Sequence, residues 1–311
     1  MTIKKINIKF NDNDFGKYNH AFILKNKNSK HIFVIKSKTI KENPAGNILI
    51  IPPYAINSHE LFLFNYYLLE NNFNVYRFDG INNVGLSSGN IENYTLGQLE
   101  EDISLVIDSF FKKDNLPLII LTQSISFPVA LKYSTYNDQI SKIISILGVV
   151  DVKDTIERVS NTLLDPYIRK EPDLPKNLLI FGNSTIVQSF VDDMIINSLS
   201  TIEDTIFYFK RTKTPVFMVS SKNDEYVNYK DVTKCKEYIE EKGKLIVLSD
   251  ISHMIGRSLF LAKKLAKLTV EIAANRHSNK NNFSFPKLTD VIKFASIEAE
   301  FLNKCISKER I

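Results

Sequence analysis

Residues 116–130 read LPLIILTQSISFPVA, which joins an apolar run to a segment of helical character through a central serine. The apolar run shows no polar alternation, a pattern typical of a strand buried on both faces. A strand that turns directly into a helix at Ser124 lifts the hydroxyl above the sheet and points helix N-terminal N–H groups at it. Ser124 is therefore either a helix cap, the commoner role of such a hydroxyl, or a nucleophile.

Apolar runs of the same kind alternate with helical patterns along most of the chain. The predicted strands are NILIIPP (47–53), NVYRFD (74–79), LPLIILTQ (116–123), KIISILGVV (142–150), TPVFMVSS (214–221) and GKLIVLS (243–249). Helices are expected near 60–71, 96–112, 127–136 and 257–275. Strands without an exposed face, spaced by helices, predict an α/β fold with a mostly parallel sheet covered on both faces.

Three segments depart from this rhythm. Residues 4–37 hold short alternating runs between Asn- and Asp-rich turns, which predict an N-terminal antiparallel meander with one buried face. Residues 151–213 have helical stretches around a Pro-containing connection, and we expect them to form a helical cap over the carboxyl edge of the sheet. The core would then comprise residues 1–150 and 214–311, ending in an amphipathic helix over 287–308.

Composition narrows the class of protein. The 311 residues are 44% hydrophobic and 24% charged, and the longest apolar runs are far shorter than the ~20 residues of a membrane-spanning helix. We therefore expect a cytoplasmic protein without a membrane span. The net charge of +5 comes from scattered lysines, which argues against nucleic-acid binding. Cys235 and Cys305 lack metal-ligand or disulfide spacing, and no phosphate-binding glycine motif occurs, so we expect neither a metal nor a cofactor.

A nucleophilic serine needs a base, and the base needs an acid to hold its tautomer. Among five histidines, His253 follows the last predicted strand and precedes the last helix of the sheet. Asp224 lies in the loop after the strand at 214–221. The order Ser124, Asp224, His253 is the Ser, Asp, His order of α/β-hydrolases, so we predict these three residues as the catalytic triad.

Other carboxylates and histidines stay open as alternatives. Asp250 is nearer to the base in sequence and Asp151 follows another strand, although both are more simply surface or capping residues. Asp79 is placed to orient a loop beneath the site. His59, after the first parallel strand, is the alternative base.

The tetrahedral intermediate of acyl transfer requires two N–H donors for its oxyanion. One is predicted to come from Ile125, directly after the serine. The other is expected from the loop after the first parallel strand, PPYAIN, where Pro52 and Pro53 offer no N–H. We place this second donor at Ala55.

At residues 76–95, YRFDGINNVGLSSGNIENYT, the chain resembles the acyl transferase family of bacterial bioluminescence systems. The resemblance continues at 146–159 (ILGVVDVKDTIERV), 221–227 (SKNDEYV) and 249–256 (SDISHMIG), with similar spacing over about 47–275. It implies an α/β-hydrolase that cleaves acyl carrier protein or coenzyme A thioesters through an acyl-serine and releases a long-chain fatty acid, chiefly tetradecanoic. Partner enzymes, an acyl-protein synthetase and an acyl reductase, would then convert the acid to the aldehyde used for luminescence.

The resemblance also bears on single residues. The family carries its nucleophile in an Ala-x-Ser-x-Ser elbow, so Ser126 stands where many hydrolases have glycine. Thr122 stands where the family has alanine, and Met254 where it has aspartate after the histidine. Asp224 and His253 match the family's acid and base.

Two other functions share these residues: a carboxylesterase or another small-ester hydrolase on the same triad, and a catalytically silent hydrolase-like protein that binds partner enzymes. A helical stripe in the cap either lines an acyl tunnel or packs the cap onto the sheet. Its members are Ile186, Val187, Phe190, Val191, Met194, Ile195 and Ile196.

Overall fold

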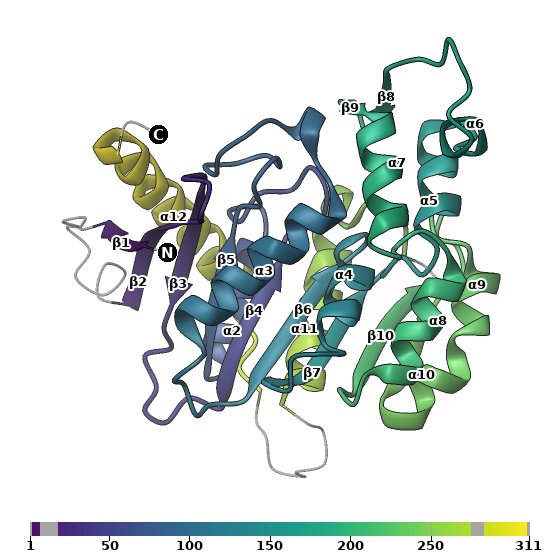
Figure 1. The fold of residues 1–311 in the computed structure, drawn as a ribbon. Helices are drawn as coiled ribbons and strands as arrows, with labels where there is room; N and C mark the ends of the chain where they lie inside the picture. Colours follow the sequence, from purple (N-terminus) through teal and green to yellow (C-terminus); the bar gives the residue numbers. More distant parts are fainter. Residues whose placement is uncertain (1, 7–17, 250, 275–282, 310–311) are drawn as a thin grey trace.

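A large sheet forms the centre of the computed structural model, which describes residues 2–6, 18–249, 251–274 and 283–309. Within these residues nine strands pair in the order β1-β2-β3-β5-β4-β6-β7-β10-β11 (Figure 1). Their bounds are β1 Thr2–Ile6, β2 Asn19–Lys25, β3 His31–Ser37, β4 Gly46–Ile51, β5 Phe73–Phe78, β6 Leu118–Gln123, β7 Ile140–Ile146, β10 Val216–Ser221 and β11 Lys244–Leu248.

The sheet is antiparallel at its N-terminal end and parallel elsewhere. Strands β1, β2, β3 and β5 pair antiparallel, whereas β5, β4, β6, β7, β10 and β11 pair parallel. Every residue of β4 and β5 is buried, as the apolar runs predicted. The predicted meander and parallel sheet are both confirmed.

Helices cover both faces of the sheet (Figure 1). Side chains of one strand alternate between two cores: Ile48 and Ile50 pack with helices α2 and α11, while Leu49 and Ile51 pack with α3, α4 and α8. The helices are α2 Phe62–Glu70, α3 Leu96–Phe110, α4 Ser126–Tyr133, α5 Val152–Ser160, α6 Asp165–Ile168, α7 Val187–Ile196, α8 Ile202–Arg211, α9 Tyr229–Lys234, α10 Lys236–Lys242, α11 Leu259–Ala273 and α12 Leu288–Glu309, with short 3-10 turns at Ile91–Asn93 and Ile255–Arg257.

Helix α4 ends three residues before the predicted boundary. The Ser134 hydroxyl donates to the Leu131 carbonyl at 2.7 Å and also pairs with Thr212. A side chain thus binds a carbonyl of the last turn, which has no intrahelical partner, and the chain leaves the helix.

The segment between β7 and β10 contains α5 to α8 and a hairpin of β8 (Asn177–Ile180) and β9 (Asn183–Ile186). Residues 184–186, which we expected to begin a helical stretch over 184–199, instead lie in β9. Phe181 and Gly182 both have positive φ, 49° and 79°, as the two-residue turn that matches strand twist requires. The hairpin contacts the loops after two sheet strands: Tyr54 Oη lies 2.7 Å from Thr185 Oγ1, and Phe181 stacks edge-on against Tyr226.

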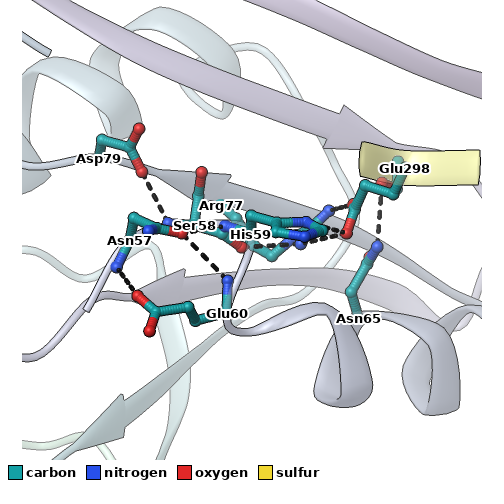
Figure 2. Close-up of polar contacts among 9 residues, drawn as sticks. Asn57, Ser58, His59, Glu60, Asn65, Arg77, Asp79 and Glu298 are labelled. Carbon is teal, nitrogen blue, oxygen red and sulfur yellow. Dashed lines mark hydrogen bonds and ion pairs between the residues drawn. The ribbon is translucent and has the colours of Figure 1, made fainter. Parts of the chain in front are cut away.

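Helix α12 is fastened to the sheet by a buried ion pair (Figure 2). Glu298 of α12 binds the Arg77 guanidinium of β5, and both side chains are fully buried. His59 Nδ1 lies 3.2 Å from the same carboxylate, and Arg77 Nη1 also donates to the Ser58 carbonyl at 2.8 Å. The pair therefore connects α12 to β5 and to the loop after β4.

The sequence composition raised two questions, whether a helix could span a membrane and whether the cysteines are reactive. No helix in the described part of the chain combines the length and apolar composition needed to cross a membrane. Cys235 is buried, and that burial raises the pKa of its thiol to about 12, so it is not a thiolate near neutral pH.

The ion pair predicts a pH-dependent stability. Burial by itself would raise the pKa of Glu298, but the Arg77 charge and the His59 contact outweigh it and hold the pKa below its ordinary value. A carboxylate with a lowered folded-state pKa contributes stability above its unfolded pKa, and the contribution is lost as pH falls through the folded pKa. Glu298→Gln should cost about 3 kcal/mol at pH 7, because it leaves the buried guanidinium without a counter-charge.

Denaturant unfolding of the two proteins between pH 7 and pH 3 checks this. The stability difference between wild type and Glu298→Gln should shrink as the pH falls below about 4.5. A difference that stays constant over this range would show that the ionised pair does not hold α12.

Candidate active site

The turn between β6 and α4 places Ser124 in a left-handed backbone conformation, with φ of 55°. Its N–H donates to Ile146 of β7, and its carbonyl accepts from Val149 after that strand. An L-residue in this region costs roughly 1–2 kcal/mol. The neighbouring strand thus holds a strained turn that brings the hydroxyl to the carboxyl edge of the sheet.

Thr122 and Ser126 lie two residues before and two residues after Ser124, and the hydroxyl of each binds backbone within the crowded turn. Ser126 Oγ donates to the Gln123 carbonyl at 2.8 Å and accepts from the Gln123 N–H at 3.1 Å. Thr122 is fully buried and donates to the Ile144 carbonyl of the adjacent strand at 3.4 Å. The turn therefore forms without glycine, because each hydroxyl is bound to backbone.

The structure brings the three predicted triad residues together. Ser124 Oγ lies 2.7 Å from His253 Nε2, and His253 Nδ1 lies 2.9 Å and 3.1 Å from the two carboxylate oxygens of Asp224. The side chains of His253 and Asp224 are 5% and 2% exposed, so water competes little for these bonds. With one ring nitrogen donating to the carboxylate, the other can accept a proton from the serine.

The acid and base are each held by further contacts. Asp224 Oδ1 accepts from the Tyr226 and Val227 N–H groups, both at 2.9 Å. The Tyr226 ring packs edge-on against the imidazole of His253. These contacts fix the carboxylate and the ring in the orientation that joins them.

Glu225 is a residue of the site that sequence reasoning missed. Its carboxylate accepts the backbone N–H of His253 at 3.1 Å and the Ser252 hydroxyl at 2.9 Å. Burial works to raise the pKa of Glu225, but hydrogen bonds from the backbone N–H groups of Glu225 itself and His253 and from the Ser252 hydroxyl outweigh it and lower the pKa. The carboxylate thereby ties the acid loop to the base loop, and its position directly after Asp224 is the one sequence signal that pointed to it.

The two expected oxyanion donors differ in availability. Ile125 precedes α4, and its N–H has no acceptor among the described residues. The Ala55 N–H instead donates to Asn83 Oδ1 at 2.9 Å, so it is not available to a substrate oxygen in this structure. The preceding N–H, that of Tyr54, has no acceptor in the described part of the chain.

The alternative acids and bases have other partners. Asp151 caps α5 by accepting from the Asp154 N–H. Asp79 is buried and accepts from the N–H groups of Ser58 and Leu86, so it joins the loop after β4 to the loop after β5. His59 faces Glu298 rather than Ser124, and Asp250 lies outside the described residues.

The seven side chains of the stripe predicted in the cap differ in exposure, and Ile186, at the end of β9, is partly buried. Val187, Phe190, Val191 and Met194 are buried in the main core, whereas Ile195 and Ile196 are 43% and 80% exposed. The buried members pack α7 against the rest of the protein. The described residues contain no cluster of three or more His, Cys, Asp or Glu side chains placed to hold a metal ion.

Comparison with known proteins identifies the family of the chain. Residues 17–289 match the model of a family described as acyl transferase. An acyl transferase of Aliivibrio fischeri is 28% identical over 255 residues, which cover 81% of each chain. An acyl transferase of Vibrio campbellii is 26% identical over 257 residues, covering 81% of this chain and 83% of that protein.

A solved structure supports the fold. Est1E of Butyrivibrio proteoclasticus, determined with ferulic acid bound, superposes with a TM-score of 0.64 at 17% identity and covers 80% of this chain and 98% of its own. The likeness shows that the chain has the α/β-hydrolase fold, as predicted.

The strained turn predicts an unusual stability order at position 124. Ser124→Gly and Ser124→Ala both remove the hydroxyl, but only glycine adopts φ of 55° without steric cost. After allowing for the greater freedom of glycine in the unfolded chain, Ser124→Gly should be the more stable by about 1 kcal/mol. Denaturant unfolding of the two variants measures this, and an alanine variant of equal or greater stability would contradict the strain.

Proposed function

The chain belongs to the acyl transferase family, and from that premise we propose that it transfers fatty acyl groups from a thioester through Ser124. The observation that carries the proposal is the unbroken series of contacts from Ser124 Oγ through His253 to Asp224. A buried serine in contact with a carboxylate-bound imidazole is the arrangement that makes a hydroxyl nucleophilic.

In the proposed reaction, His253 Nε2 takes the proton from Ser124 as Oγ attacks the thioester carbonyl. The tetrahedral intermediate collapses, the C–S bond breaks, and the imidazolium returns the proton to the departing thiolate. His253 then removes a proton from water as the water oxygen attacks the acyl-serine. The second tetrahedral intermediate collapses, the bond between the acyl carbon and Ser124 Oγ breaks, and the imidazolium returns the proton to Oγ as the fatty acid is released. Asp224 remains ionised throughout and stabilises the imidazolium.

We assign the oxyanion donors to the N–H groups of Ile125 and Tyr54. Ile125 lies in the turn after β6 and Tyr54 lies in the loop after the adjacent strand β4, so both are at the carboxyl edge of the sheet. Neither N–H has another acceptor among the described residues. Tyr54 replaces our sequence-based choice of Ala55, whose N–H is bound by Asn83.

The proposed acyl donor is a long-chain thioester of acyl carrier protein or coenzyme A. The sequence resemblance to luminescence acyl transferases favours tetradecanoyl, with the released acid passing to an acyl-protein synthetase and an acyl reductase for aldehyde synthesis. The proteins of Aliivibrio fischeri and Vibrio campbellii carry the name acyl transferase. That shared name supports acyl transfer, and the luminescence role is our extension of it.

We propose that residues 151–213 act as a cap that covers the acyl chain, with residues 1–150 and 214–311 as the catalytic core. The β8–β9 hairpin supports this role because it contacts both loops that flank the triad. Tyr54 of the first loop meets Thr185, and Tyr226 of the second meets Phe181.

The triad assignment predicts a graded loss of acylation. Ser124→Ala should form no acyl-enzyme, and His253→Ala should slow acylation by about 10⁵-fold or more, since both activation and leaving-group protonation pass through it. Asp224→Asn should be milder, at about 10⁴-fold. Intact-protein mass after brief exposure to tetradecanoyl-coenzyme A measures acylation, and full acylation of Ser124→Ala would redirect the assignment to Ser126.

Burial of the chain predicts a preference for length. Each buried methylene contributes about 0.8 kcal/mol, so tetradecanoyl should exceed decanoyl by roughly 100-fold in kcat/KM if the cap encloses the chain. Rates are compared for thioesters and oxygen esters of both lengths. Equal kcat/KM for the two chain lengths would show that the cap does not select acyl length. Faster hydrolysis of the oxygen esters would favour a carboxylesterase. No reaction with any of the four substrates would favour a non-catalytic partner protein.

A further inference from the structure

The side chain of Asn83 is wrapped by the loop after β4. Its Oδ1 accepts from the Ala55 N–H and from the Val84 N–H, both at 2.9 Å. Its Nδ2 donates to the Pro53 carbonyl at 3.0 Å and faces the Ile56 carbonyl at 3.5 Å. Every hydrogen-bonding position of the amide thus has a backbone partner, and the side chain is buried.

These contacts determine which way two consecutive peptide units face. In a trans peptide the C=O and the following N–H point in opposite directions, and the described chain has no cis peptide. Because Asn83 binds the Pro53 carbonyl, the Tyr54 N–H in the same peptide unit points away from Asn83. Because Asn83 also accepts the Ala55 N–H, the next peptide unit has the opposite orientation: its N–H points toward Asn83 and the Tyr54 carbonyl points away.

The first part of the loop is strained and has few donors of its own. Ala55 has φ of 61°, a conformation that costs a residue with a Cβ roughly 1–2 kcal/mol. Pro52 and Pro53 carry no N–H, so the first part of the loop cannot be fixed by its own donors. The Asn83 amide stabilises the strained conformation through both a donor and an acceptor.

We propose that Asn83 is a positioning residue for acyl transfer, which aims the Tyr54 N–H at the oxyanion by binding the Pro53 carbonyl and the Ala55 N–H. This inference rests on the proposed function, because the oxyanion forms only if Ser124 attacks a carbonyl. Asn83 itself does not touch the substrate. Both halves of its amide are required, so neither a pure acceptor nor an apolar side chain of the same size replaces it.

Two variants separate the halves of the amide. Asn83→Asp keeps the acceptor for Ala55 but places an oxygen against the Pro53 carbonyl, and Asn83→Leu removes both bonds. Each should lower kcat for a 4-nitrophenyl decanoate ester by about 100-fold, the scale of a lost oxyanion donor, with KM changed less than about threefold. Asn83→Asp remains informative if the leucine variant does not fold.

The decisive readout is affinity for a decyl trifluoromethyl ketone, which forms a tetrahedral oxyanion adduct with a nucleophilic serine. Its affinity should fall by about 100-fold in both variants, while inhibition by decanoic acid, which forms no such adduct, stays within about threefold. Asn74→Leu is the matched control: Asn74 is equally a buried amide, hydrogen-bonded to Asn47, but it lies at the opposite end of β5. It should lower stability and leave both affinities unchanged.

The outcomes distinguish the two proposals. Unchanged ketone affinity in the Asn83 variants, or losses equal to those of Asn74→Leu, would overturn the positioning role alone. A wild-type protein that forms no adduct with the ketone would overturn the proposed function, and this inference with it.

Discussion

The left-handed turn at Ser124 is the constraint on which the proposed site depends. A strand that ran on, or a helix that began one residue later, would leave the hydroxyl within the sheet or on the helix flank. The turn is held from outside by the pairing of β6 with β7 and by the hydroxyls of Thr122 and Ser126, which bind backbone. Strain of this kind persists only where surrounding contacts over-determine it, and here the central strands of a nine-stranded sheet supply them.

The parallel sheet explains why distant residues meet. The carboxyl ends of β4, β6, β10 and β11 lie at one edge, and the loops that follow β6, β10 and β11 bring together the Ser124 hydroxyl, the Asp224 carboxylate and the His253 imidazole. Loops are mobile by default, and side chains that bind backbone groups hold three of the loops at this edge. Asn83 holds the loop after β4, Glu225 joins the loops after β10 and β11, and Asp79 supports the first from below.

Local sequence was enough to predict the sheet and the turn at Ser124, and the three residues proposed as the triad lie in contact. Continuous apolar runs such as residues 118–121 admit few structures besides a buried strand, and chain order follows once the strands are placed. The second oxyanion donor that we propose, Tyr54, could not be chosen over Ala55 from the sequence. The Ala55 N–H is bound by Asn83, which lies 28 residues further along the chain. Arg77 and Glu298 are 221 residues apart in sequence, and the sequence around neither residue predicts which residue it pairs with.

The central claim, that Ser124 is made nucleophilic by the folded arrangement around it, is tested most directly with an alkyl fluorophosphonate. This reagent phosphonylates activated serines, and proteolytic mapping locates the modified residue. We expect a single adduct on Ser124 that forms in the folded protein and is lost when the protein is unfolded before exposure. An adduct on another serine, or equal labelling of the folded and unfolded chains, would contradict it.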